Sequence, residues 1–120
     1  MADIHLSIRL DLTSSDSIGP GKIALLEAIR TQGSISAAAR HLGMSYRRAW
    51  LLVDQINSGL SEPAVTAATG GASGGGAALT PVGEQVVELY RAIEDRTRSS
   101  ANGEFRALGK LVRRGQKARA

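Results

Sequence analysis

Two short helical patterns joined by a tight turn constrain the fold of this chain more than any other feature. The patterns cover about 36–42 and 46–58, and Gly43 between them suits the left-handed conformation that ends a helix. Arg47 and Arg48 stand in the first turn of the second pattern. This layout is typical of a helix-turn-helix, whose second helix lies in the major groove of DNA.

The residues around the turn agree with that interpretation. Ala38 and Ala39 are small enough to let the two helices approach closely, and Ser45 is a good N-cap for the second helix. Apolar residues recur at helical spacing in the second helix and are expected to face the core: Ala49, Val53 and Ile56.

The segments before the motif predict a strand and a helix. Residues 4–12 alternate between apolar and polar side chains, which predicts a strand with one buried face. Residues 22–32 have the spacing of a helix that ends at Gly33.

The segment 64–80 predicts a β-hairpin, because two short strand-like pieces flank a glycine-rich tip. A hairpin that follows a recognition helix is a wing, and we expect residues 69–76 to form its tip. A wing lies along the DNA backbone or enters the minor groove, and glycine lets the main chain approach phosphates. The fold class predicted is therefore mainly α with a small β component, in the form of a winged helix-turn-helix.

Thr80 and Pro81 are good first residues for a further helix, predicted to run to about Ser99. Its expected apolar stripe is Val82, Val86, Leu89, Tyr90 and Ile93. Ion pairs at i,i+4 spacing are expected between Arg91 and Asp95 and between Glu94 and Arg98. We expect a break at Asn102-Gly103, so that residues 1–103 form the DNA-binding and dimerisation domain and 104–120 a short helical segment with a disordered basic tail.

Composition excludes several classes of protein. The chain has 120 residues, 42% of them hydrophobic, with no cysteine. No apolar run approaches the roughly 20 residues that a membrane helix needs, and the N-terminus lacks a secretory signal, so we expect one small cytoplasmic domain.

The net charge of +4 comes from the end of the chain: residues 1–105 hold nine basic and eleven acidic side chains, whereas 106–120 hold six basic and no acidic ones. Between residues 20 and 50, five basic side chains face one acidic side chain, Glu27.

Three segments resemble the N-terminal domain of ModE-type molybdate-responsive transcriptional regulators, and more distantly the LysR-type DNA-binding domain. They are Lys22–Ala39, Gly43–Trp50 and Ala68–Gly83, and the resemblance covers about 4–98. It implies a homodimer held by the N-terminal strand region and the helix after the wing, with two recognition helices on a palindromic operator in duplex DNA. The sequence ends where the molybdate-binding domains of that family begin. We therefore expect molybdate to be at most a metabolic context, a cognate regulon or a ligand of some partner.

The candidate DNA-binding residues come from the helix-turn-helix, its supports and the wing. We expect four residues at the start of the second helix in the major groove: Ser45, Tyr46, Arg47 and Arg48. Arg40 and Lys22 are expected to contact the DNA backbone. The wing candidates are Thr69, Gly70, Gly71, Ser73 and Gly74. Trp50 is expected to pack in the core or against the wing.

Other functions find less support in the sequence. The glycine-rich loop lacks the Gly-Lys-Ser/Thr ending of a nucleotide-binding P-loop, and no catalytic triad or carboxylate pair stands out. We expect neither enzymatic activity nor a cofactor, and His5 and His41 lack neighbours at metal-ligand spacing. The alternative is a winged helix that binds another protein through its wing and last helix.

Overall fold

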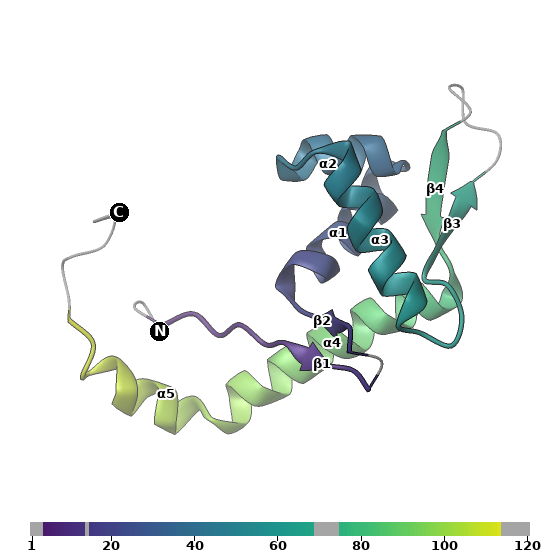
Figure 1. Cartoon of the computed structure of the whole chain (residues 1–120). Helices are drawn as coiled ribbons and strands as arrows, with labels where there is room; N and C mark the ends of the chain where they lie inside the picture. Colours follow the sequence, from purple (N-terminus) through teal and green to yellow (C-terminus); the bar gives the residue numbers. More distant parts are fainter. Residues whose placement is uncertain (1–3, 14, 69–74, 114–120) are drawn as a thin grey trace.

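The computed structural model describes residues 4–13, 15–68 and 75–113. Helix α1 (Pro20–Gln32) is the centre of the fold, and the other helices of the core pack around it (Figure 1). Its side chains Ile23, Leu25, Leu26 and Ile29 are fully buried. Apolar residues on several sides of one helix let it contact α2, α3 and α4 together, which places the core along α1.

Helices α2 (Ile35–Leu42) and α3 (Tyr46–Ser58) form the predicted helix-turn-helix. Gly43 ends α2 with a φ of 69°, in the left-handed region that favours glycine. The Ser45 hydroxyl caps α3 by accepting a hydrogen bond from the Arg48 amide at 3.0 Å. Ala38 and Ala49 are fully buried, so small side chains lie where the helices are closest. The predicted motif is confirmed in its helices, turn and cap.

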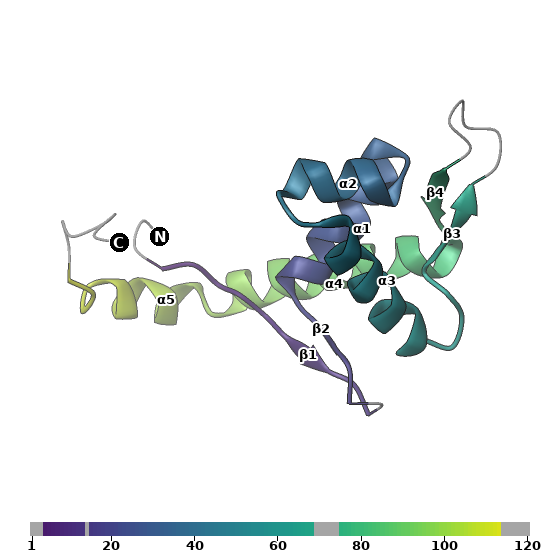
Figure 2. The ribbon, with the colours of Figure 1, turned by 45° about the horizontal axis from the view of Figure 1, so that its top comes forward.

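Strands β3 (Val65–Ala68) and β4 (Gly76–Leu79) pair antiparallel to form the predicted hairpin. It stands at one end of the domain, beside α3 (Figure 2). The Ala77 amide donates to the Gly33 carbonyl at 2.9 Å, which ties β4 to the end of α1. The hairpin is therefore anchored to the helices and does not project from them independently.

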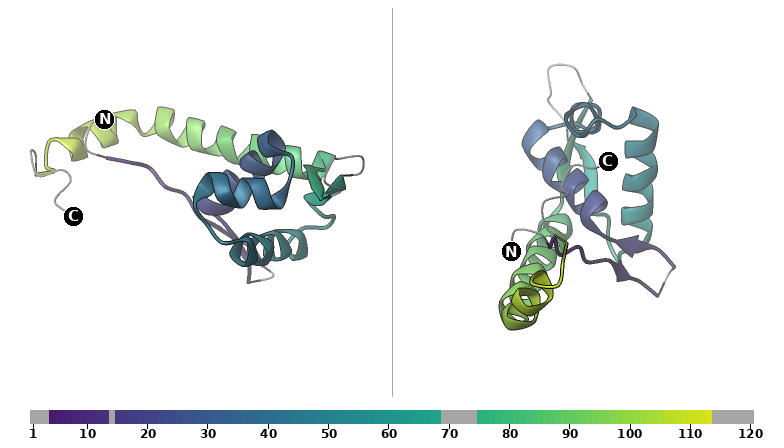
Figure 3. Two further views of the ribbon diagram at one scale, coloured as in Figure 1. Left: turned by 90° about the horizontal axis from the view of Figure 1, so that it is seen from above. Right: turned by 90° about the vertical axis from the view of Figure 1, so that its left-hand side faces the viewer.

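The N-terminal segment differs from the predicted strand over residues 4–12. Burial alternates along it as predicted, but only β1 (Leu10–Asp11) pairs with another strand, β2 (Ser17–Ile18). The physical reason is that α1 begins directly after β2, so β2 is too short to pair with the preceding residues. Residues 4–9 run beside α4 and α5 instead, and the Ile8 carbonyl accepts a hydrogen bond from the Tyr90 hydroxyl at 2.6 Å (Figure 3).

Helix α4 (Pro81–Ser100) crosses the domain on the side of α1 opposite to α3 (Figure 3). Thr80 caps it through the Gly83 amide, as its sequence predicts. Its buried face was predicted only in part. Gly83, Val87 and Tyr90 are buried, whereas Leu89 is 60% exposed. Because the backbone at Ala64, just before β3, packs closely against the small Gly83, the buried line runs through Gly83 rather than through its larger neighbour Val82.

Helix α5 (Asn102–Gly109) continues almost directly from α4 and extends beyond the core (Figure 1). The break expected at Asn102-Gly103 is wrong, because both residues are in the first turn of α5 and only Ala101 interrupts the helices. Both residues are exposed there, and weak helix formers cost little near a helix end. Among the described residues, no helix has the length and apolar character needed to cross a membrane.

Candidate nucleic-acid interface

The first turn of α3 is open to solvent. Tyr46, Arg47 and Arg48 are all exposed, and so is the capping residue Ser45. The helix packs against the core through its buried residues, which are Ala49, Leu52, Val53 and Ile56. Because these side chains occupy one face of α3, the residues of the opposite face are presented outward.

The exposed part of α3 has three sides. Tyr46 and Trp50 line a hollow that faces the hairpin. Arg47 and Leu51, one helical turn apart, lie opposite the buried face. Arg48 lies about 200° around the helix from Tyr46, on the side away from the hairpin. The two arginines therefore leave the helix in different directions, about 100° apart.

Neither arginine is engaged by the rest of the described chain. No ion pair or hydrogen bond joins the guanidinium group of Arg47 or Arg48 to any residue within 4–13, 15–68 and 75–113; the hydrogen bond from Arg48 to the Ser45 hydroxyl comes from its backbone amide. The Ser45 hydroxyl, by contrast, is used as the cap of α3. Two guanidinium groups are thus available for an external anion or hydrogen-bond acceptor at the start of this helix.

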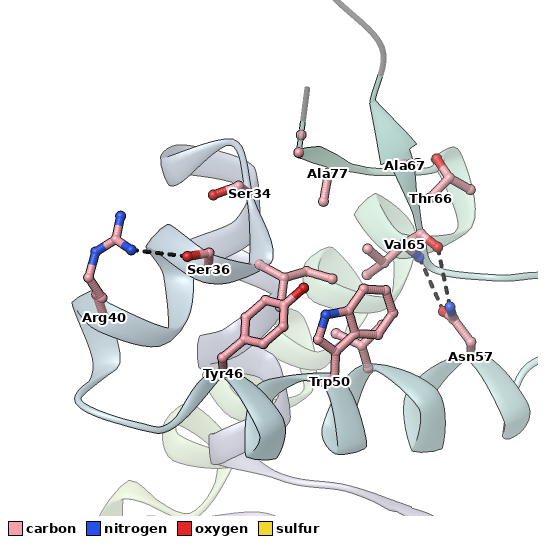
Figure 4. A pocket seen from close by; sticks show the side chains of 14 residues that line it. Ser34, Ser36, Arg40, Tyr46, Trp50, Asn57, Val65, Thr66, Ala67 and Ala77 are labelled. Carbon is pink, nitrogen blue, oxygen red and sulfur yellow. Dashed lines mark hydrogen bonds between the residues drawn. The ribbon is translucent and has the colours of Figure 1, made fainter. Parts of the chain in front are cut away.

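A hollow of about 670 Å³ lies between α2, α3 and the hairpin. The Tyr46 and Trp50 rings stand in it edge to face, with their centres 6.3 Å apart (Figure 4). Ser36 and Arg40 lie at its α2 side, and Thr66 lies at its hairpin side. Aromatic faces between polar rims are suited to a partner that has both flat and polar groups, such as a nucleic-acid strand.

Trp50 is 43% exposed and is not a core residue. It shares the lining of the hollow with Val65, Ala67 and Ala77 of the hairpin strands. Of the two positions that the sequence left open, the core position is wrong, because the ring lies on the hairpin side of α3. The structure places Trp50 beside the hairpin, which is the wing alternative.

Asn57, at the end of α3, is a residue that the sequence analysis missed. Its side-chain oxygen accepts hydrogen bonds from the amides of Ala64 and Val65, and its side-chain nitrogen donates to the Val65 carbonyl. Figure 4 shows this pairing at the start of β3. Asn57 therefore fixes where the hairpin begins relative to α3. An amide side chain near the end of a helix and just before a loop was the signal available.

The supporting basic residues have different surroundings. Arg40 is exposed and donates to the Ser36 hydroxyl at 3.0 Å, at the edge of the hollow. The Lys22 ammonium group donates to the Ser17 carbonyl at 2.7 Å, beside β2 and outside the hollow. Arg30 forms an ion pair with Glu84 of α4 at 2.9 Å. Within the described part of the chain, Arg40, Arg47 and Arg48 form no ion pair and supply positive charge near α3.

The wing-tip candidates lie outside the described residues; these are Thr69, Gly70, Gly71, Ser73 and Gly74. The structure does place the two strands that lead to them. Both strands line the hollow, and Gly75 lies at its edge. The contribution of the tip to DNA binding stays a prediction.

An ion-pair cluster joins α4 to α1 behind the recognition helix. The Arg91 guanidinium donates to both carboxylate oxygens of Glu27, at 2.9 and 2.7 Å, and to Glu94 at 2.7 Å. Hydrogen bonding from Arg91 holds the pKa of Glu27 below its ordinary value, against an opposing effect of burial. The expected i,i+4 pairs are wrong, because Arg91 turns toward α1 and pairs at i+3, as Arg98 does with Asp95.

Curated proteins provide an independent comparison. The chain is 54% identical over 77 residues to the molybdenum-pterin-binding protein MopB of Rhodobacter capsulatus, covering 64% of this chain and 28% of that protein. It is 41% identical over 85 residues to the molybdenum transport protein ModE of Azotobacter vinelandii, covering 71% and 32%. It is 42% identical over 71 residues to the DNA-binding transcriptional dual regulator ModE of Escherichia coli K12, covering 59% and 27%. No protein-family model matches the chain.

The fold and the exposed α3 define the chain as a winged helix-turn-helix protein. The relatives confirm the resemblance stated from the sequence: the chain is similar to ModE-type proteins and fits a ModE-like N-terminal domain. The chain spans less than a third of the length of these three curated relatives. The E. coli relative is named as a DNA-binding transcriptional regulator.

Proposed function

We propose that this chain is a sequence-specific regulator of transcription that binds duplex DNA through α3 and the hairpin. The observation that carries the proposal is the pair of exposed arginines in the first turn of α3, whose guanidinium groups pair with no described residue. The E. coli relative, named as a DNA-binding regulator, supports the same function. The names of the relatives also support a regulon in molybdenum metabolism.

The two arginines have different roles in this proposal. Arg47 points outward from the middle of the exposed face, so it enters the major groove and donates to a guanine edge, a contact that discriminates by about 1–3 kcal/mol. Arg48 lies on the side away from the hairpin and neutralises a phosphate. Arg40 takes a second phosphate at the other edge, beside the hollow. Tyr46 contacts the strand that passes between α3 and the hairpin.

We infer that the regulator acts as a homodimer. Leu89 and Ile93 are exposed on α4, one turn apart, and they continue the apolar line of Val82 and Val86. A second copy that covers this line would place two α3 helices on opposite sides of a twofold axis, as a palindromic operator requires. The variant Leu89→Lys is expected to shift sedimentation from dimer to monomer at micromolar concentration.

The experiment that tests DNA binding selects duplexes from a randomised library and compares the variants Arg47→Ala and Arg48→Ala on them. Arg47→Ala is expected to relax the preference at one base pair in each half-site. Arg48→Ala is expected to weaken binding to all duplexes and to lower the salt slope by about 0.9, the value for one phosphate. Arg98→Ala, which removes an equal charge from α4, is the matched control and leaves both quantities unchanged.

Salt distinguishes this function from the alternative, a module that binds another protein. A DNA complex that neutralises several phosphates weakens steeply as the salt concentration rises. If neither arginine variant changes duplex affinity, the assignment of α3 to the groove is wrong. If no duplex is enriched from the library, the proposed function is wrong as a whole.

A further inference from the structure

Leu51 is a large apolar side chain that does not contribute to the core. It is 50% exposed in the middle of α3, and it belongs neither to the buried cluster nor to the residues packed against it. It does not line the hollow beside the hairpin either. The exposed face of a recognition helix usually carries polar side chains. A leucine on that face therefore indicates contact with an apolar group of a binding partner.

The neighbours of Leu51 show which direction it faces. Arg47 is one turn before it and Asp54 is three residues after it, and both side chains are exposed on the same side of α3. The Asp54 carboxylate would be repelled by phosphate. A face that carries Arg47, Leu51 and Asp54 is therefore suited to base edges and not to the phosphate backbone.

We propose that Leu51 contacts the 5-methyl group of a thymine in the major groove and so determines part of the sequence specificity. This inference rests on the proposed function, since it needs α3 in the groove. Leucine has no polar atom for a phosphate or for a hydrogen-bonding base edge. The thymine methyl is the apolar group that a base pair presents in the major groove.

Helix geometry limits where this thymine lies. Residues 47 and 51 are separated by about 6 Å along the axis of α3, at 1.5 Å per residue. Successive nucleotides of one strand are about 3.4 Å apart. The thymine is therefore within about two base pairs of the base that Arg47 reads, in each half-site.

The test removes the methyl group from the DNA and leaves the protein unchanged. Duplexes selected by the wild-type protein are prepared with deoxyuridine in place of each thymine in turn, and the Kd is measured at fixed salt. At one thymine per half-site, within two base pairs of the position relaxed by Arg47→Ala, the affinity of the wild-type protein is expected to fall about fourfold. Leu51→Ala is expected to bind the thymine duplex with the same loss and to be indifferent to deoxyuridine there.

Leu108→Ala is the matched control, because Leu108 is a leucine of equal exposure (51%) on α5. It is expected to keep the wild-type response to deoxyuridine. The inference is overturned if no thymine near the Arg47 position responds, if the selected sites hold no thymine there, or if Leu51→Ala responds to deoxyuridine as the wild type does. In each of these results the effect of Arg47→Ala still supports the proposed function, whereas failure to enrich any duplex overturns both.

Discussion

Asn57 pairs with the backbone of Val65 in the way that a neighbouring strand would. Its side-chain oxygen accepts from the Val65 amide and its side-chain nitrogen donates to the Val65 carbonyl, both at 3.2 Å. The same oxygen accepts from the Ala64 amide at 2.8 Å. Ala64 and Val65 are buried, so these backbone groups have little access to water. The last turn of α3 thus holds the first residues of the hairpin in place through the Asn57 side chain.

Replacing Asn57 should therefore loosen the hairpin and destabilise the protein. Asn57→Ala leaves two buried amides without their acceptor and is expected to lower the free energy of unfolding by about 1–3 kcal/mol. Asn57→Asp keeps the accepting oxygen and should lie between the wild type and the alanine variant. Urea denaturation measures the stabilities, and hydrogen exchange at the Ala64 and Val65 amides locates the effect. Ser58→Ala, at the adjacent exposed position, is the control, and an equal loss in both alanine variants would contradict the prediction.

Gly83 allows α4 to approach the chain before β3 more closely than any other residue would. A Cβ atom at this position would lie 2.3 Å from the Ala64 carbonyl oxygen, which also accepts a hydrogen bond from the Thr80 amide. The obstacle is backbone and cannot turn aside. Gly83→Ala is expected to destabilise the protein by about 1–3 kcal/mol, although alanine is the better helix former.

Gly103→Ala provides the comparison for Gly83, because a Cβ atom at Gly103 meets no atom within 4 Å in α5. This variant should be neutral or slightly more stable. Thermal denaturation of both variants at one protein concentration measures the difference. A Gly83→Ala variant as stable as the Gly103→Ala variant would show that α4 can shift away from Ala64 at no cost.

The Glu27–Arg91 pair should make stability depend on pH in the acid range. The pKa of Glu27 is lowered in the folded protein, chiefly by hydrogen bonding from Arg91. A lowered folded pKa means that the stabilisation is present above the ordinary pKa of 4.5 and is lost as the pH falls through the folded value. Glu27→Gln is expected to cost about 0.5–1 kcal/mol at pH 7, because both partners are partly exposed.

This cost should shrink as the pH falls below the ordinary pKa of 4.5 and disappear below the lowered folded pKa, where wild type and variant both carry a neutral side chain at position 27. Urea denaturation of the two proteins between pH 7 and pH 3 measures the difference. Asp11→Asn is the control, since Asp11 pairs with Arg9 at the surface. A Glu27→Gln cost that stays constant over this range would indicate that the ionised carboxylate does not stabilise the fold.

The sequence was sufficient for those elements whose signals are local. The cap at Ser45, the left-handed turn at Gly43 and the helical spacing of the buried residues of α3 all act within a few residues, and each was confirmed. The pairing of Glu27 with Arg91 connects residues 64 positions apart. Local spacing instead suggested an i,i+4 partner for Arg91, because the spacing along one helix does not show that α1 packs against it.

Residues 4–12 show the same limit for a strand. Their alternation correctly predicted which side chains are turned inward, since burial on one face needs only a period of two. Whether a strand pairs depends on the length of its neighbour, and β2 has only two residues before α1 begins. Leu51 was missed for a related reason, because a leucine in an amphipathic helix is indistinguishable by type from a core residue until the packing is known.

Tyr90 connects α4 to the N-terminal segment and should make stability depend on pH in the alkaline range. The side chain is buried, and its hydroxyl donates to the Ile8 carbonyl at 2.6 Å. Burial raises the pKa of Tyr90 above its ordinary value of 10.0. The neutral form is therefore favoured by folding, and the stabilisation is present below pH 10.0 and lost as the pH rises through the folded pKa.

Tyr90→Phe leaves the Ile8 carbonyl without its donor and is expected to cost about 1–2 kcal/mol at pH 7. The difference from the wild type should narrow above pH 10.0. At such pH the phenol ionises in the unfolded wild-type chain but stays neutral in the folded protein, so the wild type loses stability that the phenylalanine variant keeps. Chemical denaturation from pH 7 to pH 11 at one protein concentration measures both effects. Tyr46→Phe, on the exposed start of α3, should match the wild type in stability at pH 7. A Tyr90→Phe cost that does not shrink between pH 9 and pH 11 would mean that folding does not raise the pKa of Tyr90, and no cost at pH 7 would mean that its hydrogen bond to Ile8 does not stabilise the fold.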